Sequence, residues 1–175
     1  VAIGRVALEL NNTGNFNTAT GYAALQLNDI GEYNTANGTF ALRKNSSGNY
    51  NTAVGYSALH NATTGNNNTA FGTKALQSTT TGSNNTAIGY EAGRTILSGS
   101  NNTMLGNDAQ LDFGSGSNQI RIGDQNITLA TTKVAWTTSS DARYKEQIRT
   151  VPLGLDFINR LRPVDYVRSD NKKEN

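Results

Sequence analysis

The chain contains no cysteine, so disulfides and thiolate metal sites are excluded. His60 is its only histidine, which removes the usual histidine-based zinc sites and catalytic triads. No apolar run approaches membrane-spanning length, and no segment has the pattern of a signal peptide. The net charge of +2 is too small to indicate nucleic-acid binding. We therefore expect no metal, cofactor or nucleic-acid partner, and no membrane insertion of this segment.

Charged residues are scarce over most of the chain and dense near its end. Residues 1–140 hold seven Lys/Arg and seven Asp/Glu, whereas residues 141–175 hold eight and six. This change in composition predicts a domain boundary near residue 140. The chain begins with Val1 rather than methionine, and we expect a longer parent protein.

Glycine is the residue that organises the sequence, because it recurs every 17 residues without a slip in register. The first series is Gly4, Gly21, Gly38, Gly55, Gly72, Gly89, Gly106 and Gly123. A second series follows ten residues later, at Gly14, Gly31, Gly48, Gly65, Gly82, Gly99 and Gly116. A fixed period of this length is the signature of stacked identical units rather than of a globular enzyme core.

Each unit of the repeat predicts a short strand, a tight turn, a second short strand and a polar loop. In the unit 51–67 the inward positions are expected to be Ala53, then Gly55 or one of its neighbours, then Ala58 and Leu59. A first-series glycine such as Gly55 is expected to supply a positive φ or a close backbone approach. The asparagines before each strand are expected to form a stacked hydrogen-bonding ladder; they are Asn17, Asn34, Asn51, Asn68 and Asn85.

The interior of such a stack would be thin and rich in alanine. One coil offers about one leucine and a few alanines against the backbone entropy of 17 ordered residues. Sharing the interior among several chains would offset this cost, so we expect a homo-oligomer. The leucine after each alanine gives way to Gly93 and Gln110, which predicts a change of shape after about residue 92.

Two segments carry a resemblance to a known family. Asn-Thr-Ala-Val-Gly-Tyr-Ser-Ala-Leu (51–59) and Asn-Thr-Ala-Ile-Gly-Tyr-Glu-Ala (85–92) resemble the head repeats of trimeric autotransporter adhesins, and similar repeats occur in phage tail fibres. The resemblance spans residues 1–123. It implies an all-β fold, a left-handed, solenoid-like parallel β-roll, and the glycine period gives this roll about eight 17-residue coils. It also implies two further copies of the chain as partners, in a homotrimer.

Tyr22, Tyr56 and Tyr90 occupy the same slot in alternate coils and are the only ligand-binding candidates in the repeats. Stacking on a sugar is one interpretation, and packing against the next coil is the simpler one. Asp108, Asp112 and Asp124 fit no calcium-loop spacing, and we interpret them as solvated turn residues.

The sequence after the repeats alternates in period two, at Ile120, Ile122, Ile127, Leu129, Val134 and Trp136. This pattern predicts a β-rich neck over residues 124–140 in which Trp136 is a core or interchain anchor. The run Ser139-Ser140-Asp141-Ala142-Arg143-Tyr144-Lys145 then resembles the start of the intramolecular chaperone domain of the endosialidase type. Pro152 and the apolar stripe before Pro163 fit the helix expected next, so residues 141–175 are predicted to be a short α+β start of that domain.

The second resemblance implies self-cleavage near the Ser140-Asp141 step. Ser140 would be the nucleophile and Lys145 its base, which requires a lowered lysine pKa. Attack by Ser140 on its own carbonyl would need a strained four-membered ring, so the preceding carbonyl or a neighbouring chain is the better target. The side of Ser140 on which the bond is cut stays open.

The function predicted is that of a structural segment of a phage tail fibre or spike, located in the virion. It would contribute to attachment to a host-surface receptor, with carbohydrate as one candidate class, and would carry a C-terminal chaperone for trimerisation and folding. The alternatives are a bacterial trimeric adhesin on the cell surface, and a self-cleaving serine endopeptidase acting at the neck. The latter can coexist with either structural role.

Overall fold

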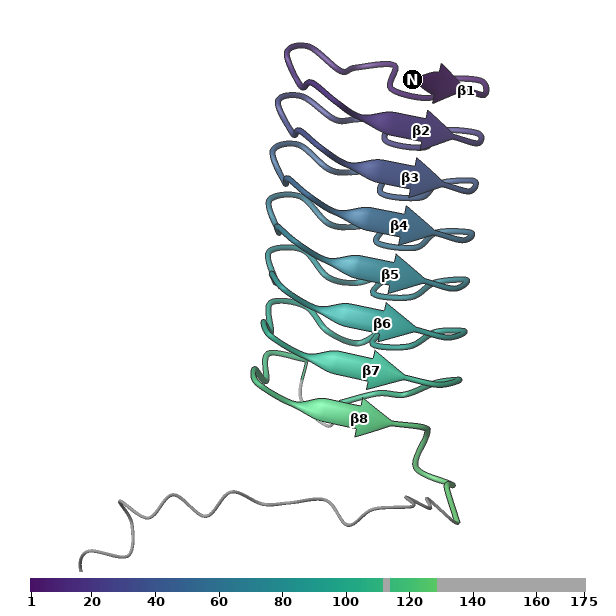
Figure 1. Cartoon of the computed structure of the whole chain (residues 1–175), viewed down its shortest axis with the longest axis vertical. Helices are drawn as coiled ribbons and strands as arrows, with labels where there is room; N and C mark the ends of the chain where they lie inside the picture. The colour runs from purple at the N-terminus through teal and green to yellow at the C-terminus, as the bar shows by residue number, and fades with distance from the viewer. Residues whose placement is uncertain (112–113, 129–175) are drawn as a thin grey trace, which may run out of the picture. The chain divides into compact units, whose positions relative to one another are not determined.

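The computed structural model describes residues 1–111 and 114–128, all within one compact unit, Val1–Ala130. Its eight strands stack in chain order into one parallel sheet (Figure 1). They are β1 (Ala2–Ile3), β2 (Thr18–Thr20), β3 (Thr35–Asn37), β4 (Thr52–Val54), β5 (Thr69–Phe71), β6 (Thr86–Ile88), β7 (Thr103–Leu105) and β8 (Ile120–Ile122). The described residues contain no helix, and hence none that could cross a membrane.

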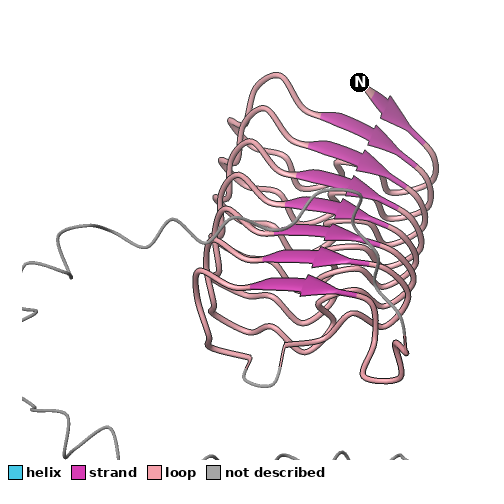
Figure 2. Cartoon of the chain, turned by 60° about the horizontal axis from the view of Figure 1, so that its bottom comes forward, coloured by secondary structure: helices cyan, strands magenta, loops and turns pink. Residues whose placement is uncertain are grey.

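Every strand pairs with the residues 17 positions later, so the sheet register is the sequence period. Ala36 of β3 lies opposite Ala53 of β4, which lies opposite Ala70 of β5. The chain leaves each strand, loops round and returns one level further along, as the stacked turns in Figure 2 show. The predicted parallel β-solenoid is therefore confirmed, with seven coils joining the eight strands.

The predicted second strand of each unit is wrong. The segment after Gly55 is a turn in which Ser57 and Leu59 have φ values of 54° and 50°. Left-handed values at alternating residues curl the backbone, so it cannot extend as a strand. The segment still bonds to the coils on either side: the Ser57 N–H donates to the Thr39 carbonyl at 3.0 Å, and the Leu59 N–H donates to the Ala75 carbonyl at 2.9 Å.

The interior is the narrow column that the sequence predicted. Ala53, Ala58 and Leu59 are completely buried, as are their counterparts in most other coils. Leucine rarely adopts a left-handed φ. The burial of its whole side chain offsets that cost here. Each level of the core holds one large side chain and a few alanines, which is why the coils depend on the stack.

The stack keeps its register beyond residue 92, but its interior is repacked. Gly93 takes the leucine position with a φ of 62°, and Met104 replaces the buried alanine of the next strand. A Cβ on Gly93 would lie 2.6 Å from the Met104 methyl carbon and 2.9 Å from a Leu76 methyl carbon. Methionine and the buried Ile96 thus fill the space that leucine fills in earlier coils. The expected change therefore concerns side chains, not strand pairing.

First-series glycines are required by both conformation and space. From Gly4 to Gly106 their φ values lie between 120° and 139°, which only glycine adopts readily. A Cβ on Gly55 would also lie 2.6 Å from the carbonyl carbon and oxygen of Gly72 in the next coil. The close approach predicted from the sequence is confirmed.

The buried asparagines form the predicted ladder. Each side-chain oxygen accepts the backbone N–H of the next asparagine; for Asn51 the donor is Asn68, at 3.0 Å. Each side-chain nitrogen donates to a second-series glycine carbonyl; for Asn51 this is Gly65, at 2.8 Å. The ladder continues through Asn102 to the backbone N–H of Gln119. Asparagine is therefore repeated because it satisfies two buried backbone groups per coil.

Candidate functional surfaces

The outer face of the sheet carries an exposed apolar column. In β2 to β6 the central alanine points inward, as Met104 does in β7, and the residues on either side of it point outward. We call the residue before each first-series glycine the strand-end column; its members are Ile3, Thr20, Asn37, Val54, Phe71, Ile88, Leu105 and Ile122. Phe71, Ile88, Leu105 and Ile122 are 43–56% exposed on four successive coils. Exposed apolar residues that gather in one place mark an interaction surface.

Two of the three tyrosine candidates meet at one residue from the coil between them. The Phe40 ring packs edge-on against Tyr22 at 5.4 Å and against Tyr56 at 6.1 Å. His60 also contacts Phe40, and the Arg43 guanidinium lies 5.5 Å from its centroid. These residues come from three coils, and we call them the Phe40 cluster. Tyr22 thus packs against the next coil and Tyr56 against the previous one, and both stay about half exposed.

Burial lowers the pKa of His60, and the nearby positive charges of Lys44 and Arg43 lower it further, against an opposing hydrogen bond with Asn61. The imidazole is therefore neutral at pH 7. The cluster combines exposed aromatic edges with the fixed positive charge of Arg43, and the exposed Lys44 lies next to Arg43 in the chain. Such a surface suits a ligand with apolar faces and acidic groups.

Tyr90, the third candidate, lies away from the Phe40 cluster beside a charged group. Glu91 pairs with Lys74 of the previous coil at 3.1 Å and with Arg94 at 3.0 Å. The hydrogen bond from Lys74 lowers the pKa of Glu91 and raises that of Lys74. Tyr90 is therefore not part of one continuous tyrosine site with Tyr22 and Tyr56.

A second aromatic group was not predicted from the sequence. Phe16, Tyr33 and Tyr50 lie at the corner before successive strands, with ring centroids 4.8 and 4.9 Å apart and nearly parallel planes. All three are exposed and have φ values between 55° and 59°. Their 17-residue spacing was a visible signal, because they occupy one slot of the repeat.

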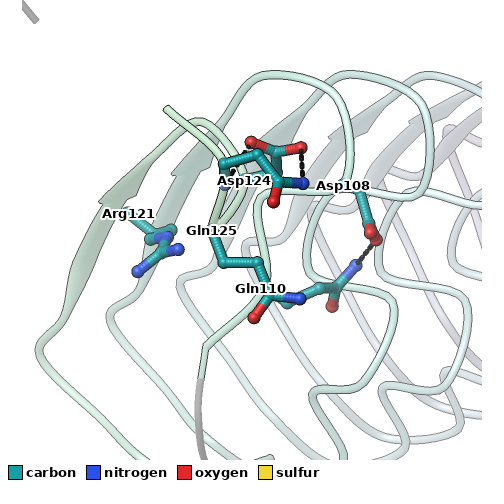
Figure 3. A pocket seen from close by; sticks show the side chains of 6 residues that line it. Asp108, Gln110, Arg121, Asp124 and Gln125 are labelled. Carbon is teal, nitrogen blue, oxygen red and sulfur yellow. Dashed lines mark hydrogen bonds between the residues drawn. The ribbon is translucent and has the colours of Figure 1, made fainter. Parts of the chain in front are cut away.

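A polar hollow lies beside the last strand, lined by Asp108, Gln110, Arg121, Asp124 and Asn126 (Figure 3). Its carboxylates already have partners: Asp124 accepts from the Asn126 backbone at 2.9 Å, and Asp108 accepts from Gln110 at 2.9 Å. Over residues 1–111 and 114–128 the structure brings no three metal-ligating side chains together. Asp108 lies in a turn and Asp124 directly before one, and Asp112 lies outside the described residues.

The proposed cleavage residues Ser140, Asp141 and Lys145 also lie outside the described residues, as do Trp136 and the segment 141–175. Their roles stay predictions. The same holds for the domain limits 1–123, 124–140 and 141–175.

Comparison with protein families gives one match in this region. The family model described as "Chaperone of endosialidase", named for the S74 peptidases, matches residues 140–175. The match begins at Ser140 and covers less than half of the chain. Comparison with curated proteins and with solved structures gives no match.

Proposed function

We propose that this chain is a structural segment of a fibre in which three parallel copies pack side by side through their strand-end columns. The repeats form the stiff shaft of a phage tail fibre or spike, and the C-terminal segment belongs to a chaperone that aligns the copies for folding. The protein is then a component of the virion that contributes to host attachment.

The observation that carries this proposal is the position of the strand-end column. Phe71, Ile88 and Leu105 follow one another at one-coil spacing on the outside of a sheet whose interior is mostly alanine. A copy related by rotation about an axis parallel to the stack presents the same apolar residues at the same level. Burying them would supply the apolar contact that the narrow interior lacks.

The family match supports the second half of the proposal. The match at residues 140–175 bears the description of a chaperone and follows the repeat region in the chain. Three solenoids with identical coils can pair in shifted registers, because each coil resembles the next. A chaperone that trimerises first would fix the register.

The Phe40 cluster is the part of the described shaft best suited to attachment. Its exposed tyrosines and the cations Arg43 and Lys44 suit a surface glycan with acidic groups. A bacterial trimeric adhesin on the cell surface would use the same architecture. A secretion signal and a membrane anchor in the full reading frame would favour that alternative, whereas virion genes beside it would favour the fibre.

The self-association test compares two aspartate substitutions in the 175-residue chain. Ile88→Asp places three like charges in the proposed interface and should weaken association by about 100-fold or more. Thr81→Asp adds the same charge on an exposed loop and should leave association unchanged. Sedimentation velocity over a dilution series measures both. Equal association of the two variants would contradict the proposed interface.

Self-cleavage is a second candidate function, favoured because the match to a model named for a peptidase family begins at Ser140. The Ser140 oxygen would attack a peptide carbonyl and form an ester, while the broken C–N bond leaves an amine that takes up the serine proton through Lys145. Water would then hydrolyse the ester. The full-length protein should run as two fragments on a denaturing gel, and Ser140→Ala and Lys145→Ala should run as one band. A single full-length band for the wild type would exclude the activity.

A further inference from the structure

Two neighbouring columns of residues on the solenoid surface take turns in being apolar: one is apolar in the first coils and the other in the later coils. We call the residue two positions before each strand the corner column; its members are Phe16, Tyr33, Tyr50, Asn67, Asn84, Asn101 and Asn118. Where the corner residue is aromatic, the strand-end residue of the same coil is Thr20 or Asn37. Where the corner residue is asparagine, the strand-end residue is Phe71, Ile88, Leu105 or Ile122. Only the coil of Tyr50 and Val54 is apolar in both columns.

The corner position favours asparagine on conformational grounds. Every corner residue has a φ between 55° and 60°, a left-handed value that asparagine tolerates and that bulky side chains rarely adopt. Phe16, Tyr33 and Tyr50 therefore strain the backbone at positions where the later coils use asparagine. Stacking offsets part of that strain, but the three rings remain 45–73% exposed. Aromatic corners thus add open apolar surface in the two coils whose strand end is polar, Thr20 or Asn37, and in the one coil that links the two columns, that of Tyr50 and Val54.

We infer that the contact between copies of this chain moves from the corner column to the strand-end column along the shaft. The inference rests on the proposed trimer and locates its interface. Apolar surface follows the corner from Phe16 to Tyr50, crosses the sheet at Tyr50 and Val54, and follows the strand ends from Val54 to Ile122. Each of the seven coils therefore places an apolar residue in at least one of the two columns.

A second copy is the occupant that this surface fits. The apolar column changes at a fixed coil of the 17-residue repeat. A parallel copy in the same register therefore places an aromatic corner opposite an aromatic corner, and an apolar strand end opposite an apolar strand end. Polar residues then also meet polar residues, at Asn37 in one half and at Asn84 in the other. A partner without this repeat would have to match a surface that changes column midway.

The lateral shift implies that the copies wind around one another. The corner and the strand end are separated by four residues, a sideways distance of about 13 Å at roughly 3.3 Å per residue. The shift occurs over seven coils, or about 33 Å of axis at roughly 4.7 Å per coil. The apolar residues that make the contact shift sideways across the face of each copy. The copies can keep these residues in contact along the whole shaft only if they twist about the common axis. In coiled coils, an apolar stripe that drifts around each helix causes supercoiling in the same way.

Single cysteines test this directly, because the chain has none of its own. Four variants form a crossed set: Tyr33→Cys and Asn84→Cys in the corner column, and Asn37→Cys and Ile88→Cys in the strand-end column. Each is oxidised under native conditions, and interchain disulfide is measured on a non-reducing gel. We expect Tyr33→Cys and Ile88→Cys to cross-link at least tenfold faster than Asn37→Cys and Asn84→Cys.

The outcomes separate this inference from the proposed function. A trimeric mass with both strand-end cysteines cross-linked and both corner cysteines free would mean a straight interface, and would overturn the inference alone. Faster cross-linking of Asn37→Cys and Asn84→Cys would overturn it as well. A monomeric mass without cross-linking would overturn the trimer and the inference together. If a variant lost its β-sheet circular dichroism, the same comparison at Phe16, Thr20, Asn101 and Leu105 would replace it.

Discussion

The side-chain oxygen of Asn51 accepts the backbone N–H of Asn68 at 3.0 Å, one full coil away. The Asn51 side-chain nitrogen donates to the Gly65 carbonyl at 2.8 Å. Asn51→Ala would leave both buried backbone groups without these bonds, at a cost of about 1–3 kcal/mol each. We expect the free energy of unfolding to fall by about 2–4 kcal/mol in urea denaturation. Thr69→Ala, an exposed neighbour of Asn68, should change it by less than about 0.5 kcal/mol.

Gly55 and Gly93 should respond differently to the same added methyl group. At Gly55 the new Cβ would meet backbone atoms of Gly72, and its φ of 130° is unsuited to alanine. At Gly93 the Cβ would meet the ends of the Met104 and Leu76 side chains, which can move, and its φ of 62° resembles the leucine positions. Gly55→Ala should lower the free energy of unfolding by about 3 kcal/mol or more, and Gly93→Ala should lower it by about 1–2 kcal/mol. Equal thermal midpoints would contradict this account of the glycine series.

Asn45 marks the end of a shorter asparagine column. Its side-chain nitrogen donates to the Asn28 oxygen at 2.6 Å, but its own buried oxygen has no hydrogen-bond donor among the described residues, because Ala62 follows one coil later. Ala62→Ser would place a hydroxyl donor in that column and should stabilise the chain by about 1 kcal/mol. Ala58→Ser puts the same hydroxyl into the apolar interior and should destabilise it. Thermal unfolding measures both, and destabilisation by Ala62→Ser would mean that the hydroxyl does not reach Asn45.

His60 should make the fold sensitive to mild acid. Burial lowers the pKa of His60 in the folded chain below its unfolded value, so the unfolded chain binds more protons as the pH falls through about 6.5. The contribution of His60 to stability is therefore fully present above that pH and is lost progressively below it. His60→Gln should show a smaller drop in thermal midpoint between pH 7.5 and pH 5.0 than the wild type. Identical drops would show that His60 is not desolvated.

The repeat made the architecture predictable, because strand register, the asparagine ladder and the glycine spacing are all direct consequences of the 17-residue period. The second strand was predicted wrongly, because nothing in the residue types Ser57 and Leu59 signals a left-handed φ. Leucine is held in that conformation by burial, which only the stacked coil supplies. The Phe40 cluster was missed because Phe40 occupies a slot that differs in every coil, and its contacts come from both neighbouring coils.

Association of identical copies is the central claim, and sedimentation equilibrium of the 175-residue chain tests it most directly. The exposed column of Phe71, Ile88 and Leu105 predicts a folded trimer with three times the 18.7 kDa mass of one chain. This trimer should persist at micromolar protein concentration. A folded species that stays at 18.7 kDa would contradict the account.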